Sequence, residues 1–274
     1  MAQLTMFEDS DEKIVDDFQF VFNDKIDIQL GDMFQLGDHY LMCGDATNYH
    51  HIKKLLNGNL IDLYITDPPY NVSYEGKTLE KMTIMNDKMN NDDFRLFLRK
   101  SFANINQYLK EGSTFYIFHA DSEGYNFRGA CNDVLWKIRQ CLIWNKNTFI
   151  LGRQDYHWKH EPILYGWKEG AAHNWYGDRS QNTVLDYEKP NRNELHPTMK
   201  PTELYIYLMK NSSKKGDIVL DNFAGSGTVI IASEYTGRKG YAMELDPIYC
   251  NVIIQRWQQL TGKKAIKVEH SIST

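Results

Sequence analysis

Two apolar runs, each followed by a polar motif, constrain the fold of this 274-residue chain more than any other feature. Residues 60–66 lead into Asp67-Pro68-Pro69-Tyr70 (the DPPY motif), and residues 217–221 lead into Phe223-Ala224-Gly225-Ser226-Gly227 (the glycine turn). Short apolar runs bounded by turn residues are typical of buried strands. Ligands of open α/β sheets bind at the carboxyl ends of strands, so we expect the two motifs to form one site.

The remaining pattern predicts an α/β fold with a doubly wound, mostly parallel sheet, because strands alternate with helices. Strands are expected at 40–43, 60–66, 113–118, 137–144, 161–167, 217–221 and 240–244, with a further short one at 18–22. Helices are expected at 49–57, 92–109 (capped by Asp92 or Asp93), 123–135, 201–212, 226–236 and 247–260, and a polar loop at 72–91. We predict a lead-in over 1–35, one domain over 36–265 with an irregular insertion at about 171–195, and a tail over 266–274.

Charge is distributed unevenly along the chain. The net charge is -5, yet residues 1–40 hold ten acids and two bases, so the rest of the chain is positive. Residues 137–168 contain six bases and two acids, interleaved with aromatic side chains. Phosphate contact combined with base stacking would leave such a pattern. An ordinary solvated face over a core has the same composition, so both readings remain open.

Cysteine spacing and hydropathy indicate the compartment. The four cysteines show no CxxC spacing, which predicts reduced thiols and neither a zinc site nor a disulfide framework. The start, Met1-Ala2-Gln3-Leu4, has no signal-peptide pattern, and no apolar run approaches the length of a membrane span. The prediction is a cytoplasmic protein without membrane contact or a bound metal.

The glycine turn lies where backbone can approach a ligand at a helix N-terminus. Alone it is weak evidence, because many nucleotide-binding folds use such a turn. The next expected strand ends in Glu244, which can accept hydrogen bonds from both ribose hydroxyls of a nucleoside. Asp221 would repel a pyrophosphate but can pair with a cationic amino group. These two acids favour S-adenosylmethionine over a dinucleotide.

The DPPY motif and the glycine turn together resemble the amino-methyltransferases of DNA, which carry a DPPY catalytic motif and an FxGxG motif for S-adenosylmethionine. The catalytic motif comes first here, which is similar to the circularly permuted β-type order. The resemblance spans about residues 36–262 and departs from the family at Asn222, where many relatives have proline. Asp67, rather than serine, resembles the adenine-N6 enzymes more than the cytosine-N4 enzymes, whereas RNA and protein amine methyltransferases usually present asparagine.

The resemblance implies a set of cofactor-binding residues. The segment His196-Pro197-Thr198-Met199-Lys200-Pro201 looks like one that holds the methionine end, and Asp45 looks like the acid that contacts the cofactor adenine. The expected cofactor-binding residues are Asp45, Thr198, Lys200, Asp221, Phe223, Ala224, Gly225, Ser226, Gly227 and Glu244.

Catalysis in this family needs little covalent chemistry from the protein. The Asp67 carboxylate and the Pro68 carbonyl are expected to accept both protons of an exocyclic amine, while Pro68 and Pro69 stiffen the backbone. Tyr70 would stack on a base flipped out of double-stranded DNA. Positioning and preorganised electrostatics would then supply the rate.

The expected DNA contacts come from the basic stretch and the insertion, which falls where β-type enzymes place target recognition. Asn145-Lys146 and the segment 160–165 are similar to family motifs lining the target pocket. The expected DNA-binding residues are Lys146, Arg153, Lys159, His160, Trp175 and Arg179, with Tyr176, Gln181 and Asn182 also available to read base edges.

The sequence thus predicts an S-adenosylmethionine-dependent DNA adenine-N6 methyltransferase of a bacterium or phage, from a restriction-modification system or acting alone. Cytosine N4 is the alternative target. A catalytically silent nucleic-acid-binding protein and an NAD-dependent oxidoreductase are alternatives of other classes. Relatives of β type often form homodimers, and a partner endonuclease cannot be read from the sequence.

Overall fold

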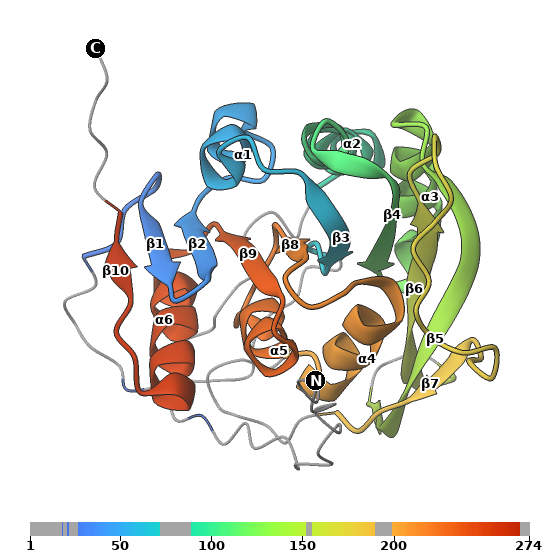
Figure 1. Ribbon diagram of the computed structural model, residues 1–274. Coiled ribbons are helices and arrows are strands. Elements are labelled where there is room, and N and C mark those ends of the chain that lie inside the picture. The colour runs from blue at the N-terminus through green and yellow to red at the C-terminus, as the bar shows by residue number, and fades with distance from the viewer. Residues whose placement is uncertain are drawn as a thin grey trace, which may run out of the picture.

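The computed structural model describes residues 18, 21, 27–71, 89–151, 155–189 and 199–268. Ten strands of these ranges form one sheet in the order β10-β1-β2-β9-β8-β3-β4-β6-β5-β7 (Figure 1). The strands are β1 (Met33–Leu36), β2 (His39–Cys43), β3 (Ile61–Thr66), β4 (Leu109–Phe118), β5 (Lys137–Ile150), β6 (Trp158–Trp167), β7 (Val184–Asp186), β8 (Ile218–Asp221), β9 (Lys239–Glu244) and β10 (Ile266–Lys267).

Helices cover both faces of the sheet, which confirms the doubly wound α/β fold. One face carries α1 (Tyr49–Leu56), α2 (Asn91–Asn106) and α3 (Gly124–Asp133), and the other carries α4 (Thr202–Ser212), α5 (Thr228–Thr236) and α6 (Pro247–Thr261) (Figure 1). Each face has its own apolar core, since successive strand residues point to opposite sides. No helix of the described ranges is long and apolar enough to cross a membrane.

Parallel pairing is confined to the centre of the sheet and to β7. The strands β2, β9, β8, β3 and β4 are parallel neighbours, while β1, β10 and β6 pair in the antiparallel sense. The central strands therefore end at one edge, which we call the carboxyl edge. Residues that follow these five strands in the chain are brought together there.

Several expected boundaries differ from the structure. The strands β1, β7 and β10 are not predicted, because two to four residues give too short a pattern to detect. The sheet therefore continues past residue 265, the expected end of the domain. Helix α2 is capped by Asn90, whose side chain accepts from the backbone N–H of Asp93, so the cap expected at Asp92 or Asp93 is wrong. Only Phe18 and Val21 of the expected strand 18–22 are described, and neither lies in a strand; nearly all of the loop 72–91 lies outside the described residues.

Candidate active site

The two motifs lie side by side at the carboxyl edge, as expected. Strand β3 delivers Asp67 and its neighbour β8 delivers Asp221. The hydroxyl of Thr66 donates to Asp221 Oδ1 at 2.9 Å, which joins the two strand ends directly. Strand β9 then places Glu244 beside the glycine turn, where Glu244 Oε2 accepts from the Gly225 N–H at 2.8 Å.

The glycine turn has the geometry that its sequence predicts. Gly225 and Gly227 have φ of 53° and 80°, in the left-handed region that glycine adopts without strain. Ala224 N–H donates to Met243 O at 2.9 Å, and Ser226 O accepts from Arg256 at 2.9 Å. These bonds fix the turn against β9 and α6, so its backbone is preorganised for a ligand.

Two acids flank the turn, the buried Asp221 and the half-buried Glu244. Burial raises the pKa of Asp221 to about 7, although Phe223 N–H and the Thr66 hydroxyl donate to its carboxyl. Burial likewise raises the pKa of Glu244 to about 7, although two backbone N–H groups donate to it. A bound cation or hydrogen-bond donor would favour the ionised form of both carboxyls.

Asp45 completes the row of acids. It follows β2, whose neighbour is β9, and Gly44 N–H donates to the Glu244 carbonyl at 2.8 Å. Asp45 Oδ1 accepts from both the N–H and the hydroxyl of Thr47 at 2.8 Å. The order Asp45, Glu244, glycine turn, Asp221 and Asp67 therefore follows the strand order along the carboxyl edge.

Asn222, the departure from the family pattern, has a structural role. Its side-chain oxygen accepts from Tyr64 OH at 2.8 Å, and its amide donates to Ser101 Oγ at 2.8 Å. All three side chains are buried. A buried polar network of this kind stiffens the turn in place of a proline ring.

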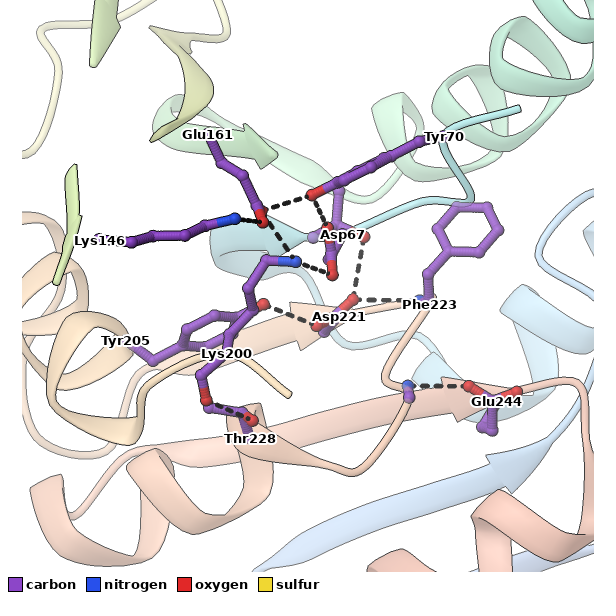
Figure 2. Close-up of polar contacts among 12 residues, drawn as sticks. Asp67, Tyr70, Lys146, Glu161, Lys200, Tyr205, Asp221, Phe223, Thr228 and Glu244 are labelled. Carbon is purple, nitrogen blue, oxygen red and sulfur yellow. Dashed lines mark hydrogen bonds and ion pairs between the residues drawn. The ribbon is translucent and has the colours of Figure 1, made fainter. Parts of the chain in front are cut away.

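Five side chains form a compact charged group around the DPPY motif, which we call the Asp67 cluster (Figure 2). Tyr70 OH donates to Asp67 Oδ1 at 2.5 Å and to Glu161 Oε2 at 3.0 Å. Lys200 pairs with Asp67 Oδ2 and lies 3.2 Å from Glu161 Oε2. Lys146 donates to Glu161 Oε1 at 2.5 Å. Two carboxylates thus share two ammonium groups and one phenol.

Burial and charge shift the two carboxyls of the Asp67 cluster in opposite directions. Burial raises the pKa of Asp67, with a further rise from Glu161 that Lys200 opposes. Burial also acts on Glu161, but the ammonium groups of Lys200 and Lys146 outweigh it and lower its pKa to about 2. Glu161 is therefore the firmly ionised member, and Asp67 the one more easily protonated.

Two lysines that the sequence analysis assigns to binding lie in the Asp67 cluster. Lys200 is expected to hold the cofactor, but its side chain reaches Asp67, and only its carbonyl faces the glycine-turn helix, accepting from Thr228 at 3.4 Å. Lys146 is expected to contact DNA from a motif that lines the target pocket; its side chain is 2% exposed and paired with Glu161, and its contact with DNA stays a prediction. Positive charge in the sequence does not distinguish a buried ion pair from a phosphate contact.

The sequence analysis places Glu161 in a segment similar to a motif that lines the target pocket, but gives it no role of its own. It lies in β6 between His160 and Pro162, at the start of the apolar run 162–165, and its side chain is 17% exposed. A carboxylate this far from solvent requires partners, but the polar residues Lys159 and His160 just before it conceal that burial in the sequence. Tyr205, which donates to Asp221 Oδ2 at 3.3 Å, is not assigned by the sequence analysis.

The basic and aromatic stretch is only partly a surface. Two of its aromatic side chains, Trp144 and Tyr165, are buried in the core, so for them packing rather than base stacking explains the pattern. Strands β5 and β6 continue past the end of β4, and this extension carries Lys159 and His160, which stay predicted DNA contacts. Its exposed apolar side chains are Phe149, Ile150, Leu151, Tyr156 and Trp158.

The insertion begins at the opposite end of the sheet from the DPPY motif. Strand β6 ends at Trp167, which pairs with Thr114, whereas Ile163 pairs with Phe118 at the end of β4, so the chain leaves β6 on the side away from the carboxyl edge. Trp175 and Arg179 line a cavity of about 470 Å³ beside α4 at that end, away from Asp67. Their contact with DNA stays a prediction, and Arg153 and Thr198 lie outside the described residues.

This fold and this row of strand-end groups define the class of α/β methyltransferases. A model of the DNA methylase family (N6_N4_Mtase) matches residues 61–256. That span covers well over half of the chain and includes the DPPY motif, Glu161 and the glycine turn. The chain therefore belongs to the DNA methylase family and is a DNA methyltransferase.

Individual relatives are more distant. The chain is 28% identical over 242 residues to the type II methyltransferase M.HpaI of Haemophilus parainfluenzae, covering 80% of this chain and 74% of that protein. It is 26% identical over 236 residues to the DNA adenine methyltransferase YhdJ of Escherichia coli, covering 74% and 78%. The solved structure of TTHA0409, a putative DNA modification methylase of Thermus thermophilus complexed with S-adenosyl-L-methionine, aligns with a TM-score of 0.60 at 22% identity, covering 86% and 100%. This last likeness supports the fold.

Proposed function

We propose that this protein transfers a methyl group from S-adenosylmethionine to the N6 amine of an adenine flipped out of double-stranded DNA at a specific sequence. The observation that carries the proposal is the hydrogen bond from Thr66 to Asp221, which joins the strand ends that lead into the two motifs. It places a cofactor turn and an amine-binding carboxylate at neighbouring strand ends. A relative named as an adenine methyltransferase and the aspartate of the DPPY motif support adenine as the target.

The row of acids fits S-adenosylmethionine. Asp45 would face the adenine, Glu244 the ribose hydroxyls and Asp221 the amino group of the methionine end. The glycine turn offers bare backbone between them, and no basic side chain of the described residues contacts Asp221 or Glu244 to suit a pyrophosphate. The bound cofactor would supply a methyl group activated by its sulfonium.

The chain's own residues bind and orient the target amine. Asp67 and the Pro68 carbonyl would accept its two protons, which draws the nitrogen lone pair out of conjugation and toward the methyl carbon. The Tyr70 hydroxyl is hydrogen-bonded to Asp67 and Glu161, and these bonds fix the ring on which the base would stack. Asp67 then takes up the proton that the amine loses, and its raised pKa favours that step.

Expression in a bacterial host that lacks its own DNA methyltransferases tests the proposal. Chromatography of nucleosides should show N6-methyladenine, and sequencing of native DNA should give the bases around each modified adenine. N4-methylcytosine without N6-methyladenine would contradict the choice of target. Thermal stabilisation by NAD but not by S-adenosylhomocysteine would contradict the choice of cofactor.

A further inference from the structure

Both oxygens of Asp67 are already engaged by protein donors. Tyr70 OH bonds to Oδ1 at 2.5 Å, and the Lys200 ammonium pairs with Oδ2 (Figure 2). The proposed function requires the same carboxylate to accept a hydrogen bond from the target amine. A carboxylate has about four acceptor sites, so the amine can be added. However, a carboxylate neutralised by an ammonium group is a weaker acceptor and a weaker base.

Glu161 contacts the same two donors. Its Oε2 lies 3.0 Å from Tyr70 OH and 3.2 Å from Lys200 Nζ, so one oxygen faces both groups that occupy Asp67. Its Oε1 is held by Lys146 at 2.5 Å. The Lys146 side chain is 2% exposed and therefore cannot leave for solvent. Glu161 is thus a fixed second acceptor within reach of both donors.

We propose that Glu161 is a positioning residue that takes over Lys200 and Tyr70 when the target amine binds Asp67. The inference rests on the proposed function and adds a residue to it. Only a small shift is needed, because both donors already lie at hydrogen-bond distance from Glu161 Oε2. Glu161 itself touches neither the base nor the cofactor in this role.

Charge balance makes such a second acceptor necessary. The Lys200 side chain is 5% exposed, and a buried ammonium that left Asp67 without another partner would be strongly destabilised. In the Asp67 cluster two carboxylates balance two ammonium groups, so Lys200 stays paired when it moves to Glu161. The loss of a neighbouring cation then strengthens Asp67 as a base.

Asp67 becomes a stronger base at the step in which the target amine loses a proton. As the amine lone pair forms the new N–C bond, the S–C bond breaks and its electron pair stays on sulfur. The nitrogen then carries a surplus proton, which passes to an Asp67 oxygen and later to water. A Lys200 that remained on Asp67 would oppose this transfer, because it stabilises the unprotonated carboxylate.

The variant Glu161→Gln keeps the shape of the side chain and removes its charge. We expect kcat to fall about tenfold to a hundredfold, the effect of one or two pKa units at Asp67. KM for DNA and Kd for S-adenosylmethionine should change less than about threefold, since the residue contacts neither. Glu161→Asp should retain more activity than Glu161→Gln.

The pH profile separates positioning from a structural role. The charged and titratable groups that act on Asp67 are Lys200, Glu161, Tyr70, Tyr205 of α4 and, across the strand ends, Asp221. In Glu161→Gln the ammonium stays on Asp67, so the acid limb of kcat should move to lower pH. A merely structural defect would lower kcat without moving the limb.

The variant Lys200→Met tests whether Glu161 acts through Lys200. In Lys200→Met, the further change Glu161→Gln should lower kcat by less than about threefold, because the donor to be repositioned is gone. Unchanged kcat and pH profile in Glu161→Gln, or an equal loss in both backgrounds, would overturn the inference. Wild-type protein that methylates no DNA would instead refute the proposed function.

A structure of the wild-type protein tests the same point without a variant. The complex would contain S-adenosylhomocysteine and a duplex with the sequence that the host experiment identifies. Lys200 Nζ should lie closer to Glu161 Oε2 than to Asp67 Oδ2 in that complex. An ammonium still seated on Asp67, with the target amine bound, would overturn the inference even if Glu161→Gln fails to fold.

Discussion

The Thr66 hydroxyl donates to Asp221 Oδ1 at 2.9 Å, across 155 residues of sequence, and both side chains are buried. This bond joins the end of β3, where the DPPY motif begins, to the end of β8, where the glycine turn begins. Tyr64 and Leu220 pair in the register just before it. This bond, the nearby bond from Tyr64 OH to Asn222 and the pairing of the two strands together fix the relative position of the two halves of the site.

Loss of this contact should weaken both stability and cofactor binding. Thr66→Val removes the hydroxyl and leaves Asp221 short of a donor, which should cost about 1–3 kcal/mol of unfolding free energy. Affinity for S-adenosylmethionine should fall as Asp221 becomes harder to ionise. Urea unfolding and calorimetric titration measure the two effects. Thr66→Ser keeps the hydroxyl and is the matched control, so equal losses in both variants would contradict the role of the bond.

Removal of the catalytic carboxylate should separate chemistry from binding. Asp67→Ala deletes the acceptor for the target amine, and we expect methyl transfer to fall at least about a hundredfold. S-adenosylmethionine binding should change little, because Asp221 and Glu244 remain in place. Transfer of labelled methyl groups to DNA measures the first effect, and calorimetry the second.

The control for this variant is Asp133→Ala, which removes an acid in a surface ion pair with Arg95. Its activity should match the wild type. Methyl transfer by Asp67→Ala at the rate of this control would show that the amine is bound elsewhere.

The sequence predicts the contacts within each motif better than the contacts between distant motifs. The glycine turn and the DPPY motif are local patterns, so their strand ends and their proximity follow from α/β topology. Lys200 and Asp67 are 133 residues apart in the sequence. Lys146 and Glu161 lie on the two neighbouring strands β5 and β6. Composition marks such residues as charged, but only the packing of β5, β6 and α4 shows that they are buried.

Cofactor affinity should depend on pH because Asp221 and Glu244 have pKa values raised to about 7 from the ordinary 3.8 and 4.5. The folded chain holds these protons more tightly than the unfolded chain. Stability therefore falls as pH rises from about 4 to about 7 and stays at the lower level above that range. A bound cationic cofactor favours ionised Asp221, so its affinity should rise by about threefold to tenfold between pH 6 and pH 8.

Calorimetry in buffers of different ionisation enthalpy measures this linkage, and proton release should accompany binding at pH 7. Asp221→Asn removes a titrating group and should bind weakly, with a smaller dependence on pH. Proton uptake on binding by the wild type would contradict the assigned role of the two acids.

The glycine turn should tolerate no side chain at Gly227. Its φ of 80° lies in the left-handed region, and an added Cβ would lie 2.8 Å from the Ile253 side chain. We expect Gly227→Ala to lose about 1–3 kcal/mol from strain and further stability from the clash, and to bind S-adenosylmethionine weakly. Gly262 has a similar φ of 68° with nothing within 4 Å of its Cβ position, so Gly262→Ala carries the strain alone. Urea unfolding of both variants isolates the clash. Equal losses would mean that the contact between the turn and α6 is looser than the structure shows, and the turn would then not be rigid enough to preorganise the cofactor site.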